Sequence, residues 1–339
     1  GKTTAVAPAL LDEDWCDGQI LLLSPRRLAA RAAAERIAQL TGSRVGGLVG
    51  YATRLDTRQS AETRILVMTE GIFRNRIIAD AELNGIAAIL FDEVHERNLD
   101  SDFGLALAIE ARAAFRPDLR LLAMSATLDG ERFAALLGNA PVITSEGRAH
   151  PLAIRYLGRD PAQPIEEAMA RAIRLGLRES DGDGLDAAIH MLHGQIDPAG
   201  QRAALRRDPE GRRKIVLATS IAETSLTIDG LGFTVDSGLA RRARFDVAAG
   251  TSRLVTERVS QAAATQRAGR AARLGPGTAW RLWEEAATGG LPPFDPPEIL
   301  EADLAPLLLD CALWGERDPA RLPWLDVPPQ AALSEARNR

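Results

Sequence analysis

Short apolar runs alternate with longer helical patterns along the first half of the chain. Four runs are long enough to be buried strands, and they cover residues 19–24, 64–68, 87–91 and 120–124. Helices are predicted between them, over about 26–39, 72–80 and 103–114. Because each run is continuously apolar, the strands are expected to form a parallel sheet that helices cover on both faces.

The second half repeats this mixture. The pattern predicts a helix over 164–178, strands over 214–218 and 232–237, and a β-hairpin over 240–258 that turns near 248–250. A proline-rich linker over 291–297 precedes a short helical unit over 298–314. We therefore predict an α/β protein with domains over 1–148 and 149–290, followed by the start of a helical unit over 291–339.

Polar residues stand where the strands of the first domain begin or end. Gly1-Lys2-Thr3-Thr4 has the form of the last residues of a phosphate-binding loop, with a helix after it. Arg26, Thr69, Asp92 and Ser125 each follow an apolar run. Since ligands of parallel sheets bind beyond the carboxyl ends of the strands, these residues are expected to share one rim.

The adjacent acids Asp92 and Glu93 come directly after the run 87–91. A carboxylate at the carboxyl end of a buried strand can hold a magnesium ion that bridges nucleotide phosphates. A solvated turn after a core strand is the alternative for an isolated acidic pair. The phosphate-loop residues Lys2 and Thr3 are expected at the same rim, and they favour the magnesium site.

Composition limits the remaining possibilities. The net charge of −5 and the pI of about 5.6 exclude a global basic field, so nucleic-acid binding would use local arginine patches. Cys16 and Cys311 lie far apart, and the four histidines form no metal-ligand cluster. No apolar run reaches the length of a membrane span, so a cytoplasmic protein without membrane contact is expected.

An arginine-rich segment lies near the end of the second domain. Arg267, Arg270 and Arg273 follow one another at intervals of three, which would place them on one side of a helix. They form either a solvated basic face or a set of arginines aimed at an anion.

Together these stretches resemble the DEAH-box subgroup of superfamily 2 helicases, and within it the bacterial HrpB-like branch. The resemblance rests on seven ordered blocks: GKTT at 1–4, SPRRLAAR at 24–31, TEG at 69–71, DEVHER at 92–97, SAT at 125–127, ATSIAETSLTIDG at 218–230 and QRAGRAAR at 266–273. It implies two RecA-like P-loop NTPase domains that bind ATP between them and RNA across their top, followed by the start of a winged-helix domain.

The resemblance also implies roles at the nucleotide. Lys2 and Thr3, with Gly1 and Thr4, would hold the phosphates, and Thr3 and Asp92 would hold Mg²⁺. Glu93 would activate the attacking water. The family further implies that His95, Ser125 and Thr127 couple nucleotide state to domain closure. From the second domain it implies contacts of Gln266, Arg270 and Arg273 with the γ-phosphate and of Asp229 with the ribose, whereas Arg267 would be structural.

For nucleic acid, the family pattern implies backbone contacts that do not depend on sequence and weaken with salt. The residues are Arg26, Arg27, Thr69, Gly71, Thr219 and Thr224, and Arg36 would stack on an end base. RNA is the implied partner and DNA remains open. The direction of movement, the pathway and any protein partner cannot be read from the sequence.

Three departures from the family pattern matter. Val94 replaces the alanine of DEAH, and Ala272 replaces a glycine. No apolar block near Asp183 and Gly184 supplies the expected first strand of the second domain, and a parallel sheet without it would leave backbone groups unpaired. We therefore expect the 339 residues to be part of a longer enzyme, with residues missing at that point.

Two functions from different classes are compatible with these patterns. The first is an ATP-dependent RNA helicase or translocase. The second is a nucleotide-dependent nucleic-acid-binding scaffold that hydrolyses little, which the incomplete phosphate loop favours. An unrelated P-loop kinase would not explain the blocks at 218–230 and 266–273.

Overall fold

The computed structural model describes residues 2–126, 130–145, 150–181, 186–223, 226–246 and 249–339. The chain divides into two compact units. The first comprises residues 1–144, 244–253 and 296–339, and the second comprises 145–243 and 254–295. The predicted α/β class with parallel sheets is confirmed.

The first unit is built on a six-stranded sheet in the order β3-β2-β4-β1-β5-β6. Its strands are β1 (Gln19–Ser24), β2 (Val49–Ala52), β3 (Thr57–Arg58), β4 (Ile65–Thr69), β5 (Ile86–Phe91) and β6 (Arg120–Ala123). All neighbours are parallel except β2 and β3. Strands β4 and β5, which are distant from β1 in the sequence, flank it on either side. Because all three strands are parallel, their carboxyl ends lie at the same edge of the sheet.

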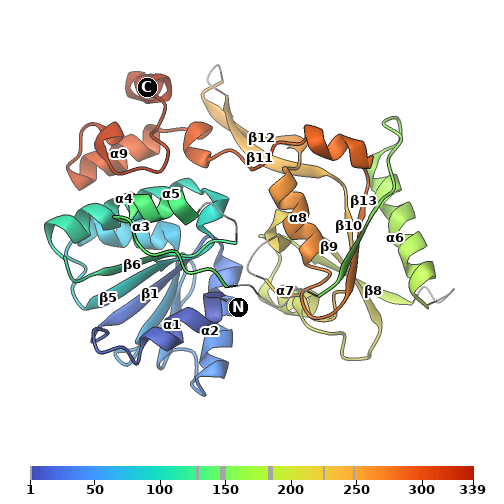
Figure 1. Ribbon diagram of the computed structural model, residues 1–339, viewed down its shortest axis with the longest axis horizontal. Coiled ribbons are helices and arrows are strands. Elements are labelled where there is room, and N and C mark those ends of the chain that lie inside the picture. Colours follow the sequence, from blue (N-terminus) through green and yellow to red (C-terminus); the bar gives the residue numbers. More distant parts are fainter. Residues whose placement is uncertain (1, 127–129, 146–149, 182–185, 224–225, 247–248) are drawn as a thin grey trace. The chain divides into compact units, whose positions relative to one another are not determined.

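Helices cover both faces of this sheet, as Figure 1 shows. Leu21 and Leu23 point into a core with α3 (Glu70–Ala79), α4 (Leu99–Ala114) and α5 (Gly130–Leu136), whereas Ile20 and Leu22 pack on the other side with α1 (Lys2–Leu10) and α2 (Arg27–Leu40). Because alternate residues of one buried strand serve opposite faces, the strand must be apolar throughout.

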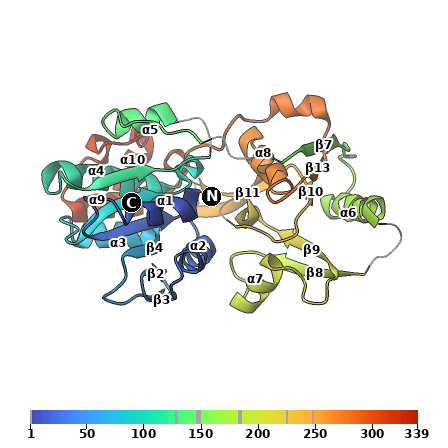
Figure 2. The same ribbon diagram turned by 60° about the horizontal axis from the view of Figure 1, so that its bottom comes forward.

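The segment from residue 296 packs on the first unit. It carries η4 (Glu298–Leu300), α9 (Ala305–Trp314), η5 (Pro319–Arg321) and α10 (Gln330–Asn338). Ile299 and Trp324 lie in the same core as α3 and α4, and the Trp324 ring stacks on Phe103 at 5.6 Å between centroids. Figures 1 and 2 show this segment beside α4. The expectation that it begins a winged-helix domain stays a prediction.

In the second unit, the described strands fall into separate small sheets. One is parallel, in the order β10-β13-β7, and comprises β10 (Phe233–Asp236), β13 (Gly277–Arg281) and β7 (Leu152–Tyr156). Another pairs β8 (Ala187–Leu192) with β9 (Arg213–Ala218) in parallel. The position between Asp183 and Gly184, where we expect missing residues, lies outside the described residues.

Helices α6 (Ile165–Asp181) and α8 (Gln261–Gly269) cover opposite faces of the three-stranded sheet. Trp280 packs with α6, whereas Trp283, just beyond β13, packs with α8. The remaining elements are α7 (Pro198–Leu205), η2 (Ser220–Ala222), η3 (Glu285–Gly290) and the hairpin of β11 (Leu239–Asp246) and β12 (Thr251–Arg258). The predicted hairpin is therefore present, and two residues of its turn lie outside the described part.

Two predicted helices differ from the structure. The helix after the acidic motif begins at Leu99 rather than Phe103, because its first turn follows directly after the turn that holds Arg97. The helix near the arginine-rich segment ends at Gly269, so Arg270 and Arg273 lie beyond it and only Arg267 is helical. The prediction of three arginines on one side of a helix was wrong.

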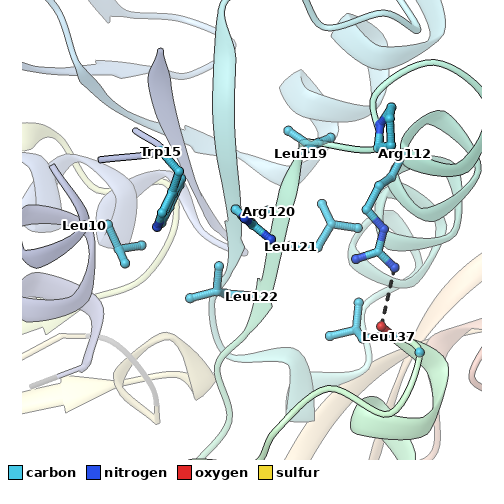
Figure 3. A pocket seen from close by; sticks show the side chains of 10 residues that line it. Leu10, Trp15, Arg112, Leu119, Arg120, Leu121, Leu122 and Leu137 are labelled. Atoms are coloured by element: carbon cyan, nitrogen blue, oxygen red, sulfur yellow. Dashed lines mark hydrogen bonds between the residues drawn. The ribbon is translucent and has the colours of Figure 1, made fainter. Parts of the chain in front are cut away.

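Strand β6 lies at an edge of the six-stranded sheet, beside a hollow of about 550 Å³. Figure 3 shows Leu10 and Trp15 on one side of this strand, and Arg112 and Leu137 on the other. The Arg112 guanidinium donates to the Leu137 carbonyl oxygen at 3.4 Å. The hollow is thus a property of the open sheet edge and is lined by residues outside the predicted site.

Candidate nucleotide and nucleic-acid site

The predicted site residues of the first unit gather at the carboxyl edge of its sheet. Ser24 pairs with Thr69 at the ends of β1 and β4. Leu23 pairs with Phe91, so Asp92 follows at the same level. The Met124 backbone donates to Phe91, which brings Ser125 to this edge as well. The shared rim therefore follows from the parallel register of distant segments.

The first residues of α1 reach this rim. The Lys2 ammonium donates to the Ser125 carbonyl oxygen. The Thr3 hydroxyl hydrogen-bonds with the Asp92 carboxylate. Because α1 begins at Lys2, the first turn of the helix and its positive dipole end lie beside these side chains. Gly1 lies outside the described residues.

Asp92 is the most deeply buried acid of the site, with 1% exposure. Burial raises its pKa to about 7, repulsion from Glu93 adds to the rise, and the Thr3 hydrogen bond and the Lys2 charge oppose it. Within the described chain, its Oδ2 atom has no hydrogen-bond partner. A buried carboxylate oxygen without a donor beside a threonine hydroxyl suits a bound hard cation such as Mg²⁺.

Glu93 and His95 sit in a tight turn after β5. Glu93 has a left-handed backbone, with φ of 53°, and precedes the single turn η1 (Val94–Glu96). The Ala126 backbone N–H donates to His95 Nδ1 at 3.3 Å, and Nδ1 lies 3.5 Å from the Glu93 carboxylate. His95 thus links the acidic motif to the segment after Ser125, of which Thr127 lies outside the described residues.

The predicted nucleic-acid residues of the first unit lie near the starts of α2 and α3. Arg26 approaches the Glu96 carboxylate at 3.5 Å, whereas Arg27 is exposed. Thr69 is the residue before α3. An added Cβ at Gly71 would approach the Asp100 carboxylate to 3.1 Å, so the backbone there is closely packed. Arg36 is exposed and donates to the Gln39 amide oxygen at 2.6 Å.

The second unit gathers its own predicted residues around α8. Arg267 donates to the Glu223 carboxylate at 2.5 Å and to the Asp236 carboxylate at 2.8 Å. Arg270 donates to the carbonyl oxygens of Glu223 and Leu226. Gln266 is partly buried on α8, and Arg273 is exposed beyond its end.

The remaining predicted residues of this unit lie in the segment after β9. Thr219 precedes η2, and its N–H donates to the Leu192 carbonyl at 3.2 Å. Asp229 is exposed in a turn, and its N–H donates to the Leu205 carbonyl at 2.8 Å. Thr224 lies outside the described residues.

Two structurally central residues were given no role from the sequence. Glu223 accepts from Arg267 through its side chain and from Arg270 through its carbonyl, so it fixes both arginines. Arg97 is buried beside Asp102. Both belong to recognised blocks, IAETS and DEVHER, and that position is the only signal by which the sequence marks them.

Comparison with family models agrees with this geometry. Residues 1–136 match the DEAD/DEAH box helicase model, and residues 169–275 match the helicase conserved C-terminal domain model. The chain therefore belongs to the DEAD/DEAH-box helicase family.

Within the family, the chain is similar to HrpB proteins. It is 42% identical to the ATP-dependent RNA helicase HrpB of Escherichia coli K12 over 359 residues, covering 99% of this chain and 44% of that protein. A crystal structure of the E. coli DEAH/RHA helicase HrpB matches with a TM-score of 0.93 and 41% identity, over 100% of this chain and 46% of that one.

A eukaryotic relative shows that the similarity is not confined to bacteria. The pre-mRNA-splicing factor ATP-dependent RNA helicase prp22 of Schizosaccharomyces pombe is 34% identical over 99% of this chain and 31% of its own length. The chain thus spans less than half the length of these curated relatives.

Two features are absent from the described residues. These residues contain no helix long and apolar enough to cross a membrane. They also contain no group of three or more histidine, cysteine or acidic side chains suited to a metal ion. A metal at Asp92 would therefore need ligands beyond such side chains, which nucleotide phosphates and water can supply.

Proposed function

We propose that this chain is the motor part of an ATP-dependent RNA helicase or translocase. The observation that carries the proposal is the meeting of Lys2, Thr3 and buried Asp92 at the carboxyl edge of the sheet, with Glu93 next in the chain. At this edge, the Lys2 ammonium can bind phosphates, and the Thr3 hydroxyl and the Asp92 carboxylate can bind Mg²⁺. The Glu93 carboxylate can accept a proton from water.

Each of these groups has a defined task in phosphoryl transfer. Lys2, freed from the Ser125 carbonyl, neutralises charge on the β- and γ-phosphates, and the helix N-terminus binds the same anion. Thr3 and Asp92 hold Mg²⁺, which supplies charge neutralisation when bound. Glu93 accepts a proton from the attacking water, and its fixed turn sets the direction of the carboxylate.

The second unit contributes a second set of charges in this proposal. Arg270 and Arg273 stabilise the γ-phosphate charge as arginine fingers, with Gln266 beside them, and Asp229 binds the ribose. Arg267 keeps α8 in place through its paired acids. Because the two sets belong to different units, hydrolysis depends on both, and this dependence is how ATP turnover drives movement.

RNA is the proposed polymer, in single-stranded or partly duplex form, because two curated relatives, HrpB and prp22, are named RNA helicases. Arg26, Arg27, Thr69 and Gly71 of the first unit and Thr219 and Thr224 of the second contact its phosphates, and Arg36 stacks on a base. Such contacts do not read sequence. Two free, buried cysteines suit a reducing compartment, and we place the protein in the cytoplasm.

The test is ATP hydrolysis by the full-length protein with and without single-stranded RNA or DNA. Turnover stimulated by RNA supports the motor. Tight ATP binding without turnover would instead indicate the nucleotide-dependent scaffold. Stimulation by DNA alone would overturn the choice of RNA.

We further propose that residues are missing from the sequence near Asp183 and Gly184. The alignment with E. coli HrpB extends over 359 positions, against 339 residues here, and the described strands of the second unit form separate small sheets. Trypsin cleaves after Arg178 and Arg202, so the given sequence predicts one peptide over 179–202. Detection of that peptide by mass spectrometry would refute the proposal.

A further inference from the structure

Arg97, the last residue of the acidic block, is held by the C-terminal segment of the chain. Its guanidinium donates to the Asp102 carboxylate at 2.9 and 3.1 Å and lies 2.6 Å from the Asp326 carboxylate. Arg97 is only 6% exposed. Although burial alone would lower its pKa, the contacts with Asp102 and Asp326 raise it, so this cation is permanent.

A second contact from the same segment holds the backbone of this turn. The Glu298 N–H donates to the Arg97 carbonyl at 3.0 Å. The Glu298 carboxylate accepts from the Leu99 N–H at 2.7 Å, in the first turn of α4. Asn98, which precedes that helix, makes no side-chain cap, so Glu298 supplies the cap from a distant part of the chain.

The turn that these contacts hold is conformationally costly. Glu93 and Arg97 have φ of 53° and 52°, and they stand on either side of η1. Left-handed backbone at such residues persists only where the surroundings impose it. At one end of the turn the Val94 N–H donates to Met124, and at the other the contacts come from Asp102, Glu298 and Asp326.

Asp326 also reaches the element that follows the Ser125 segment. Its other carboxylate oxygen accepts from Arg132 of α5 at 3.0 Å, and Arg132 donates to the Leu325 carbonyl at the same distance. A single carboxylate therefore contacts both Arg97, at the end of the turn that follows β5, and Arg132 of α5, the first helix after β6 in the described chain. Trp324, stacked on Phe103, fixes its position in the core.

From these contacts we infer that Asp326 and Glu298 are positioning residues for ATP hydrolysis, acting through Arg97 on the turn that aims Glu93. The inference rests on the proposed function. The C-terminal segment thereby sets the rate of the hydrolytic step without touching the nucleotide. A displacement of the Glu93 carboxylate by about an ångström would slow turnover by orders of magnitude while leaving phosphate binding at Lys2 intact.

The experiment compares Asp326→Asn and Arg97→Lys with Asp310→Asn in the full-length protein. Asp310 is the matched control, because it pairs with Arg74 at 3.4 Å from the same segment but does not contact the turn. Lysine retains the charge of Arg97 but cannot bind two carboxylates through a planar fork. For each variant, kcat and KM for ATP are measured with saturating RNA, together with the melting temperature.

We expect Asp326→Asn and Arg97→Lys to lower kcat by roughly 10- to 100-fold with KM within about twofold of wild type. Asp310→Asn keeps the wild-type kcat. The double variant of Arg97 and Asp326 should be no slower than the slower single variant, because both changes break one linkage. Asp326→Glu should restore part of the rate.

Two outcomes overturn the inference. One is a wild-type kcat in Asp326→Asn, and the other is an equal loss of kcat and melting temperature in Asp326→Asn and Asp310→Asn. If Asp326→Asn does not fold, the rate of Glu298→Ala, which removes the side-chain cap but keeps the backbone contact, decides by the same criteria. Absence of ATP turnover in wild type would refute the proposed function itself, which separates the two failures.

Discussion

The Thr3 hydroxyl hydrogen-bonds with the carboxylate of Asp92, and these two residues lie far apart in the sequence of the first domain. Thr3 lies in the first turn of α1 and Asp92 directly follows β5, so the contact joins the start of this helix to the carboxyl end of an interior strand. It also relieves part of the cost of burying Asp92.

Removal of that hydroxyl should weaken metal binding. In Thr3→Val, Asp92 loses a hydrogen bond and the proposed metal site loses a ligand, so the Mg²⁺ concentration for half-maximal ATP hydrolysis should rise by roughly tenfold. Titration of Mg²⁺ at saturating ATP measures this. Thr57→Val, on the exposed strand β3, is the control and should match wild type. An unchanged Mg²⁺ midpoint in Thr3→Val would remove Thr3 from the site.

Glu70 gives the protein a pH-dependent stability. It is 5% exposed, and burial raises its pKa well above the usual range; Ser101 opposes the rise, while Glu96, Asp100 and Asp102 add to it. A carboxyl whose folded pKa is raised stabilises the fold fully below its unfolded pKa, and this contribution is lost as pH rises through the folded pKa.

Glu70→Gln should therefore flatten the decline in unfolding free energy from acid to alkaline pH. The variant should gain stability relative to wild type as pH rises, and the difference should disappear in acid. Melting temperatures across that range provide the measurement. Parallel curves for the two proteins would show that Glu70 does not titrate as a buried acid.

Much of the first domain was predictable because its strands are apolar on both faces. The strand at 19–24 was predicted with its observed bounds, because a short, continuous apolar run such as 20–23 is typical of a buried strand. Strand β2 was missed because Val49–Ala52 is short, contains Gly50 and follows a glycine-rich turn, although it is fully buried. Its burial comes from β4, a tertiary effect that no local pattern carries.

The site divides in the same way. Motif residues such as Asp92 and Lys2 were assigned from short blocks. The residues that hold the turn at Arg97 were not assigned, because Asp326 and Glu298 lie in proline-rich parts of the chain without a recognisable motif. Their role depends on a long-range contact with Arg97, which sequence spacing does not encode.

Arg267 and Arg273 should separate stability from activity in the second unit. Arg267→Ala removes the guanidinium that contacts Glu223 and Asp236, which should lower the unfolding free energy by about 3 kcal/mol. Arg273 is exposed, so Arg273→Ala should keep the melting temperature and lose ATP turnover. Thermal melts and ATPase rates of both variants test this, with exposed Arg253→Ala as the control. Equal melting temperatures for Arg267→Ala and wild type would contradict the structural role.

Arg27 should contribute one phosphate contact to RNA binding. Its loss in Arg27→Ala should weaken binding similarly for different RNA sequences and reduce the slope of log affinity against log salt by about 0.7. Arg120→Ala is the matched control, because Arg120 lies at the amino end of β6. An unaltered salt slope in Arg27→Ala would exclude Arg27 from the phosphate contacts.

The most direct test of the account is ATP turnover with single-stranded RNA in wild type, Glu93→Gln and Glu82→Gln, alongside ATP affinity. Glu82 is exposed on the same unit and serves as the control. We predict RNA-stimulated turnover in wild type and Glu82→Gln, and a loss of about 100-fold or more in Glu93→Gln with ATP affinity retained. Turnover in Glu93→Gln equal to wild type would contradict the assignment of the general base and, with it, the proposed mechanism.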